Sequence, residues 1–281
     1  MITELARAKV NLTLEILGRR PDGYHELASL VAFADIGDQI TFYEGVPVGV
    51  TVTGPFAPTI AGENLIAVTL RRLAEAEPRL RLGAVTLDKQ LPVAAGIGGG
   101  SADAAAVIRA VRRSNPELAS SVDWVTIARS IGADVAVCLA NSTAWMTGVG
   151  EIVTPLPGWP TLGAVLVNPL SPAPADKTAQ VFRRLGAPSL VHGQRREPPN
   201  SGIGAIDFLT ARGNGLEPAA IAVMPVAAAV KSALLGQTGC RYAAISGGGP
   251  TCFGIFDDPL QAAVRLANDE PSWWVRAVKL G

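Results

Sequence analysis

The sequence predicts a protein of the α+β class that folds as two domains. Its 281 residues are 48% hydrophobic, which is enough to bury a large core and suits two domains better than one. Stretches typical of strands and stretches with helical spacing occur in both halves of the chain. The sequence LPGWP at residues 156–160 interrupts this pattern with two prolines and a glycine. We therefore expect one domain over residues 1–158 and a second over residues 159–281.

The first predicted element is a half-buried strand over residues 8–17, AKVNLTLEIL. Its apolar residues alternate with polar ones, which predicts a buried face and a wet face that carries Lys9 and Asn11. The following turn, GRRPDGYHE at residues 18–26, displays Tyr24 beside His25, and these two rings can stack on and hydrogen-bond a planar ligand. Taken alone, each feature also has a structural explanation, as an exposed sheet face and as a tyrosine packed on a neighbouring strand.

Further along, strands are expected at residues 39–43, 48–52 and 84–87, and a helix at residues 63–76. A glycine-rich loop follows at residues 91–106, LPVAAGIGGGSADAAA, in which Pro92 ends the strand and Ser101 is the expected N-cap of a helix. Its glycines carry no Cβ atoms, so successive backbone N–H groups can turn onto an anion at the positive end of the helix. The pattern predicts a phosphate-binding loop, although a plain glycine turn between strand and helix has the same composition.

Another predicted helix, residues 123–130, ends near a glycine and is followed by the apolar, β-like run ADVAVCL at residues 133–139. Asp134 is the single carboxylate of this run. A buried acid needs a partner, and Lys9 is a candidate for that partner. An aspartate that caps a loop beside the strand is the alternative.

The second half carries another glycine-rich segment, AAISGGGPTCFGIF at residues 243–256. Its β-like run breaks at residues 247–250 and resumes at Thr251, so the glycines lie in a loop between strands, for which a hairpin with a tight turn is an equal explanation. Around it we expect strands at residues 164–167 and 274–280, a polar loop at 188–204, and helices at 177–185, 216–223, 226–235 and 260–267.

Composition argues against several classes of function. Basic and acidic residues each number 24, so the net charge is zero and no long-range positive field would recruit nucleic acid or an acidic membrane. Three cysteines predict buried thiols in a reducing compartment rather than a disulfide framework, and with only two histidines a zinc site is not expected. The charged N-terminal residues do not have the pattern of a signal peptide or a membrane span. We therefore expect a cytoplasmic protein with a small-molecule substrate.

Three segments together resemble the signature motifs of the GHMP kinases, a family named for galacto-, homoserine, mevalonate and phosphomevalonate kinases. They are AKVNLTLEILGRRPDGYHE, LPVAAGIGGGSADAAA and ISGGGPTCFGIF, in this order along the chain. The stretches RRPDGYHEL, GADVAVCL and TGVGEIV are similar to one branch of the family, whose acceptor is diphosphocytidyl-methylerythritol. The similarity is lowest over residues 171–213. The resemblance implies the two-domain GHMP kinase fold, with the active site in the cleft between the domains.

The resemblance also implies a reaction, in which ATP with Mg²⁺ donates its γ-phosphate to the 2-hydroxyl of the cytidyl substrate on the non-mevalonate route to isoprenoid precursors. Lys9 and Asp134 would be the catalytic pair, with the carboxylate accepting the hydroxyl proton and the ammonium stabilising the developing oxyanion. Ser101 or Asp103 could contact the metal. The implied ATP-binding residues are Pro92, Val93, Ala94, Ala95, Gly96, Ile97, Gly98, Gly99, Gly100, Ser101 and Ala102. The implied substrate-binding residues are Asn11, Tyr24, His25, Phe182, Gly247, Gly248 and Thr251, with Tyr24 and Phe182 as the two faces of a cytosine clamp.

Three other functions stay open on the sequence. A GHMP kinase of mevalonate or homoserine would keep the glycine loops, but its substrate has no base for Tyr24 and His25 to hold. A non-catalytic relative that only binds ATP would be expected to lack Lys9 or Asp134. A nucleic-acid-binding module would need a basic stripe, which the zero net charge argues against. The oligomeric state is not indicated.

Overall fold

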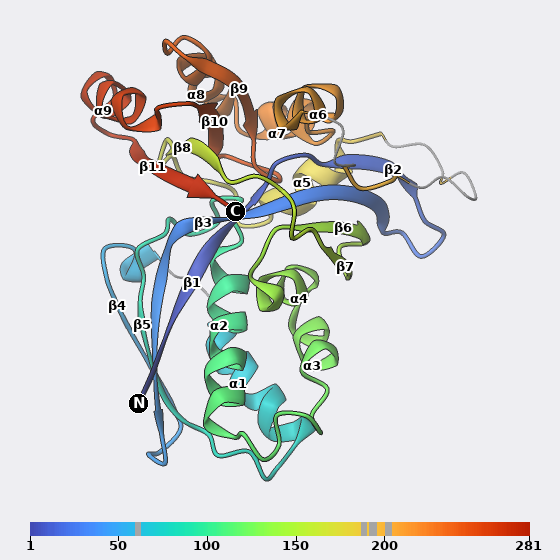
Figure 1. Ribbon diagram of the computed structural model, residues 1–281, viewed down its shortest axis with the longest axis vertical. Coiled ribbons are helices and arrows are strands. Elements are labelled where there is room, and N and C mark those ends of the chain that lie inside the picture. The colour runs from blue at the N-terminus through green and yellow to red at the C-terminus, as the bar shows by residue number, and fades with distance from the viewer. Residues whose placement is uncertain (60–62, 187–189, 191–195, 200–203) are drawn as a thin grey trace. The chain divides into compact units, whose positions relative to one another are not determined.

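The computed structural model describes residues 1–59, 63–186, 190, 196–199 and 204–281, which form two compact units (Figure 1). Unit 1 comprises Met1–Lys9, Ile36–Val93 and Gly98–Asn141, and unit 2 comprises Val10–Asp35, Ala94–Ile97 and Ser142–Gly281. Each unit is therefore assembled from separate stretches of the chain. The domain boundary expected at residue 158 stays a prediction. It differs from these units because each unit contains three separate stretches of the chain, which a single boundary cannot describe.

Unit 1 combines a sheet with four helices. Strand β4 (Gly49–Thr53) pairs in parallel with β5 (Gly83–Asp88), which pairs antiparallel with the second half of β3 (His25–Glu44), and β3 also pairs with β1 (Ile2–Asn11). The helices α1 (Leu65–Ala76), α2 (Gly99–Ser114), α3 (Trp124–Ile131) and α4 (Ala133–Ala140) pack against one another (Figure 1). Helix α2 is buried along most of its length, and its many alanines allow the neighbouring helices to approach closely. A short 3-10 helix, η1 (Ala57–Thr59), follows β4.

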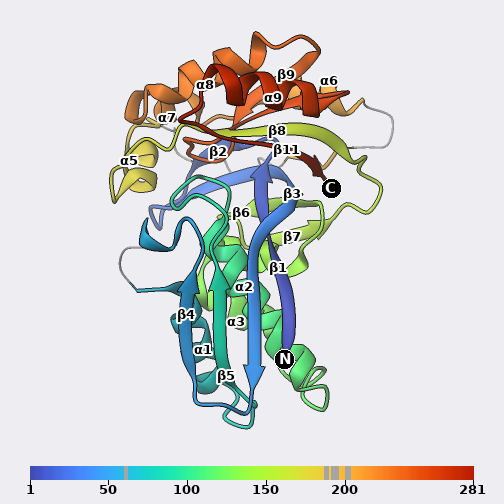
Figure 2. The same cartoon turned by 90° about the vertical axis from the view of Figure 1, so that its left-hand side faces the viewer.

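Unit 2 contains an antiparallel sheet in the order β9 (Cys240–Ile245), β10 (Cys252–Phe256), β8 (Leu162–Asn168) and β11 (Trp274–Leu280). The helices α7 (Glu217–Val223), α8 (Val226–Leu235) and α9 (Pro259–Asp269) pack their apolar residues on this sheet (Figure 2). The first half of β3 pairs with β2 (Glu15–Arg19) and with β6 (Ala144–Gly148), and β6 pairs with β7 (Ile152–Pro155). Two further helices are α5 (Lys177–Arg183) and α6 (Ala205–Arg212).

Most predicted elements are confirmed, and three expectations about them are wrong. The strand predicted over residues 8–17 is divided between two strands, because β1 ends at Asn11 and β2 begins at Glu15. Residues 133–139 form helix α4 rather than a strand, because a short apolar run has no periodicity that separates the two structures. The polar face of the first strand is not wet: Lys9 is 3% exposed and Asn11 is 2% exposed. This face is buried because other segments of the chain cover it. The predicted polar loop at 188–204 lies largely outside the described residues. Along the residues described, no helix has both the length and the apolar character to cross a membrane.

Candidate active site

Lys9 and Asp134 form an ion pair in unit 1. The Nζ atom of Lys9 lies 3.0 Å from Oδ2 of Asp134 and donates a hydrogen bond to it, which confirms the predicted partner of the aspartate. The Lys9 side chain is 4% exposed, whereas that of Asp134 is 40% exposed. Asp134 stands in the first turn of α4, where the helix dipole favours a carboxylate. A buried ammonium thus meets a carboxylate that a substrate can reach.

The N-terminus of α2 lies against Lys9. Its N-cap, Gly98, has φ = 65°, and a Cβ atom there would lie 3.1 Å from the Cβ atom of Lys9. The carbonyl of Gly98 accepts the hydrogen bond from the N–H of Ala102. The prediction of Ser101 as N-cap is therefore wrong, because a glycine in the left-handed region starts the helix three residues earlier. Since no side chain caps α2, its first N–H groups are available to an anion beside the Lys9–Asp134 ion pair.

A buried cluster of charges in unit 1 connects residues 89–91, at the start of the glycine-rich loop, with α2. The Nζ atom of Lys89 bonds to Oδ2 of Asp38 at 2.6 Å and to Oδ2 of Asp103 at 2.7 Å. The other carboxylate oxygen of Asp38 accepts hydrogen bonds from the N–H groups of Gln90 and Leu91. Burial raises the pKa of Asp103 to about 8, and its side chain is 5% exposed. Oδ2 of Asp103, which is one of the two expected metal contacts, is thus paired with the Lys89 ammonium.

In unit 2, residues 94–97 of the predicted phosphate loop lie against the turn between β9 and β10. The N–H of Thr251 donates to the carbonyl oxygen of Ala95 at 3.1 Å, and the hydroxyl of Ser246 donates to the carbonyl oxygen of Gly96 at 2.9 Å. A Cβ atom on Gly96 would lie 2.7 Å from the carbonyl oxygens of Ser246 and Gly249, so only glycine fits there. Two glycine-rich segments that are far apart in the sequence therefore lie together.

Asn11 is buried beside the same turn. Its Nδ2 atom donates to the Ser29 hydroxyl at 2.8 Å, and its N–H donates to the Ser246 hydroxyl at 3.2 Å. A Cβ atom on Gly247 would lie 3.3 Å from the Oδ1 atom of Asn11. Thr251 is fully buried, and its hydroxyl accepts a hydrogen bond from Asn168. The structure therefore brings Asn11, Gly247 and Thr251 together, with the Thr251 side chain supporting the turn. Gly248 lies in the same turn.

The predicted aromatic clamp is partly assembled in unit 2. Tyr24 follows the turn between β2 and β3 and is 65% exposed. The rings of His25 and Phe182 have centroids 5.2 Å apart and are tilted by 34°. Burial, with a smaller contribution from the charge of Arg19, holds the pKa of His25 below its ordinary value. The imidazole is therefore neutral near pH 7, with one donor and one acceptor nitrogen for the edge of a base.

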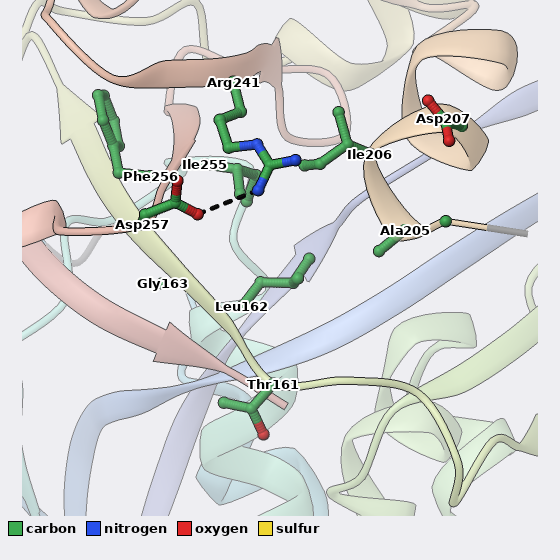
Figure 3. A pocket seen from close by; sticks show the side chains of 11 residues that line it. Thr161, Leu162, Gly163, Ala205, Ile206, Asp207, Arg241, Ile255, Phe256 and Asp257 are labelled. Carbon is green, nitrogen blue, oxygen red and sulfur yellow. Dashed lines mark hydrogen bonds and ion pairs between the residues drawn. The ribbon is translucent and has the colours of Figure 1, made fainter.

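A pocket of about 420 Å³ elsewhere in unit 2 contains none of these residues (Figure 3). Its wall is formed by Leu162, Ile206, Ile255 and Phe256 together with the charged side chains of Arg241, Asp207 and Asp257. The guanidinium of Arg241 already pairs with Asp257 at 3.0 Å, as the dashed line in Figure 3 shows. The predicted site residues therefore all lie outside this pocket.

Sequence reasoning missed several residues that hold the site. Lys89 lies two residues before the first glycine-rich segment and Ser246 directly precedes the glycines of the second, so a polar residue close to a glycine loop is a signal that could have found them. Lys177 had no comparable signal, because it lies in the stretch of lowest family similarity. Its ammonium nevertheless bonds to both glycine-rich segments.

Comparison with known proteins agrees with this geometry. The family model of the GHMP kinases N terminal domain matches residues 64–142, and that of the GHMP kinases C terminal matches residues 200–270. A 4-diphosphocytidyl-2-C-methyl-D-erythritol kinase of Rhodopseudomonas palustris is 43% identical, over 98% of this chain and 96% of that protein.

Solved structures show the same relationship. A crystal structure of 4-(cytidine 5'-diphospho)-2C-methyl-D-erythritol kinase has a TM-score of 0.77 and 31% identity, and the match covers 100% of this chain and 99% of that one. A homoserine kinase from Cytophaga hutchinsonii has a TM-score of 0.63 at 17% identity, with 99% of this chain and 95% of that one covered, and supports the fold alone. The family models, the 43% identity over nearly the full length and the similarity of the fold agree. This chain therefore belongs to the GHMP kinase family, whose members use ATP as co-substrate.

Proposed function

We propose that this protein transfers the γ-phosphate of ATP to the 2-hydroxyl of 4-diphosphocytidyl-2-C-methyl-D-erythritol, a step on the non-mevalonate route to isoprenoid precursors. The names of its relatives support this substrate. The observation that carries the chemistry is the Lys9–Asp134 pair, with its 3.0 Å contact beside the uncapped N-terminus of α2. A base, a cation and an anion-binding helix end are the parts that phosphoryl transfer to an alcohol requires.

In the proposed reaction Asp134, Lys9 and the N-terminus of α2, all in unit 1, have distinct roles. Asp134 accepts the proton of the attacking hydroxyl, for which its exposed carboxylate is suited. Lys9 stabilises the oxyanion that develops as this proton leaves. The N–H groups at the start of α2 hold the transferred phosphate through hydrogen bonds and the helix dipole.

Unit 2 supplies recognition of the cytidyl group in this proposal. Tyr24 and Phe182 stack on the cytosine, and neutral His25 hydrogen-bonds the polar edge of the base. Asn11 orients the part of the substrate that carries the hydroxyl. The turn at residues 246–251 supports the phosphate loop and the groups next to it.

Mg²⁺ is part of the proposal, and the residues fit a metal that arrives with ATP. Within the described ranges, no group of three or more His, Cys, Asp or Glu side chains is arranged to hold a metal ion. Magnesium in kinases is bound largely by substrate phosphates and water, with few protein ligands. Ser101, partly exposed in the first turn of α2, offers a hydroxyl oxygen of the suitable type. When bound, the ion neutralises charge on the phosphates.

We also propose that the protein acts in the cytoplasm, where ATP is supplied. The three free cysteines, two of them buried, suit a reducing compartment.

The test is an acceptor panel. Purified protein is incubated with MgATP and, separately, the cytidyl alcohol, mevalonate or homoserine, while ADP release is followed and phosphorus NMR locates the new phosphate. We expect kcat/KM for the cytidyl alcohol to exceed that for either other alcohol by at least about 10²-fold, because only this acceptor fills the aromatic clamp. Faster turnover of mevalonate or homoserine, or a phosphate on another hydroxyl, would contradict the proposal.

A further inference from the structure

A lysine outside the predicted catalytic residues is buried in unit 2, where it bonds to residues of both glycine-rich segments. Lys177, the first residue of α5, is 5% exposed. Its Nζ atom donates a hydrogen bond to the carbonyl oxygen of Ala94 at 2.7 Å and another to the carbonyl oxygen of Gly249. One ammonium thus ties the first turn of α5 to the phosphate loop and to the turn between β9 and β10.

This ammonium has no countercharge among the residues that the structure describes. Residues 94–97 and 246–251 contain no titratable side chain. The neighbouring Asp176 pairs with Arg183 at the surface, and Glu217 of α7, which packs on α5, pairs with Lys231. Burial accordingly lowers the pKa of Lys177 to about 8. A buried, uncompensated cation is costly to stability, so its presence calls for a role other than stabilising the fold.

The hydrogen bonds of the loop indicate that role. The carbonyl oxygens of three successive residues each accept a hydrogen bond: that of Ala94 from Lys177, that of Ala95 from the N–H of Thr251, and that of Gly96 from the Ser246 hydroxyl. In a trans peptide the N–H points opposite to the carbonyl. The N–H groups of the three following residues, 95–97, are therefore turned away from these partners and are free to face an anion.

The first of these three contacts also holds an unfavourable backbone conformation. Ala94 has φ = 54°, in the left-handed region that a residue with a Cβ atom adopts only when its surroundings impose it. The Lys177 ammonium bonds to the carbonyl of this residue. Without this ammonium, the peptide between Ala94 and Ala95 loses the hydrogen bond to its carbonyl oxygen.

We propose that Lys177 is a positioning residue for phosphoryl transfer, whose ammonium holds the carbonyls of Ala94 and Gly249 so that the N–H groups of residues 95–97 are presented to the phosphates of ATP. This inference rests on the proposed ATP-binding role of residues 92–102. It assigns to α5 a second task beside Phe182, and the task concerns ATP rather than the cytidyl acceptor.

The experiment compares Lys177→Met, which keeps an unbranched apolar side chain but removes the ammonium, with Lys177→Arg, which restores a cation. Lys231→Met is the matched control, since Lys231 is a partly buried lysine of unit 2 whose partner is Glu217. For each variant the Kd for MgATP, the KM for the cytidyl alcohol, kcat and the melting temperature are measured. The wild-type protein is measured first, so a failure of the proposed function, seen as no turnover of the cytidyl alcohol, is recognised independently.

We expect Lys177→Met to raise the Kd for MgATP at least 10-fold, to change the KM for the cytidyl alcohol less than 3-fold, and to melt within a few degrees of the parent. Lys177→Arg should recover part of the lost affinity, and Lys231→Met should bind MgATP as the parent does. An unchanged Kd for MgATP in Lys177→Met would overturn the inference. Equal loss of both affinities together with a large fall in melting temperature would also overturn it, because Lys177 would then be structural. If Lys177→Met does not fold, Lys177→Gln, which replaces the ammonium by an uncharged amide on a shorter side chain, is judged by the same criteria.

Discussion

At the residue scale, the two members of the proposed catalytic pair differ in exposure, because Lys9 is buried and Asp134 is 40% exposed. Asp134→Asn keeps the size of the side chain and removes its ability to take a proton. We expect turnover to fall at least about 10²-fold while both substrates still bind, because the base is lost and the binding groups remain. Steady-state kinetics and the binding constants of MgATP and the cytidyl alcohol measure this outcome.

The opposite result has a clear signature. If Asp134 serves only to compensate the buried ammonium of Lys9, the variant should lose stability, by about 3–5 kcal/mol, in thermal melting. A variant that melts like the parent and keeps more than about a tenth of the parental turnover would exclude Asp134 as an essential base.

Tyr24 is a second residue for which function and structure can be separated, because it is 65% exposed and adds little to a core. Tyr24→Ala should mainly raise the KM for the cytidyl alcohol, since it removes base stacking worth about 1–3 kcal/mol. The Kd for MgATP should hardly change. A loss shared equally by both substrates would instead indicate a defect in folding.

At the element scale, Arg109 of α2 connects the strand of Lys9 with the helix of Asp134, all within unit 1. Its guanidinium donates to the Glu4 carboxylate and the Leu5 carbonyl in β1, and to the Cys138 carbonyl in α4. Arg109→Met should therefore lower kcat by about 10-fold, because a small displacement of Lys9 or Asp134 from the reacting hydroxyl slows the reaction strongly. The KM for ATP should change less than 2-fold, as measured by varying each substrate in turn.

Arg113→Met is the control for this prediction. Arg113 lies on the same helix and bonds to the same Glu4, but its side chain is 61% exposed and it is joined to β1 only through that carboxylate. An exposed ion pair contributes little, so this variant should keep the parental kcat. Equal kcat values for the two variants would show that the contacts of Arg109 to β1 and α4 do not position the pair.

At the scale of the whole molecule, the reactivity of the three free cysteines measures whether the protein is folded. Cys138 and Cys252 are buried, and burial raises the pKa of each thiol to about 12, whereas Cys240 is partly exposed. A thiol reagent at pH 8 should therefore modify one cysteine of the native protein and all three after denaturation. Fast modification of all three thiols in the native protein would contradict the packing of α4 and β10.

The same thiols predict a direction for stability at high pH. Their pKa is higher in the folded than in the unfolded chain, where it is about 9, so the folded state keeps their protons longer. Their contribution to the free energy of unfolding is complete below pH 9 and is lost as the pH rises from 9 through 12. Replacement of either residue by alanine should flatten this dependence in denaturant titrations at successive pH values.

The sequence by itself determined the class of fold, the positions of the long periodic elements and the two glycine-rich segments. Helix α8 and strand β11 were predicted over the residues that form them, because local periodicity follows from the geometry of a helix or a strand. The need of a buried acid for a partner, together with the resemblance to the GHMP kinases, was sufficient to propose Lys9 and Asp134 as a pair.

Only the tertiary structure decided how polar residues are buried and what they contact. Strand β3 runs for 20 residues although only residues 39–43 were predicted as a strand, because its first half is held by pairing with β2 and with β6, which lies more than 100 residues further along the chain. The burial of Lys9 and Asn11, the helical state of residues 133–140 and the contacts of Lys177 have the same origin. Burial and hydrogen bonding depend on which distant segments pack together, and a local pattern of residues does not contain that information.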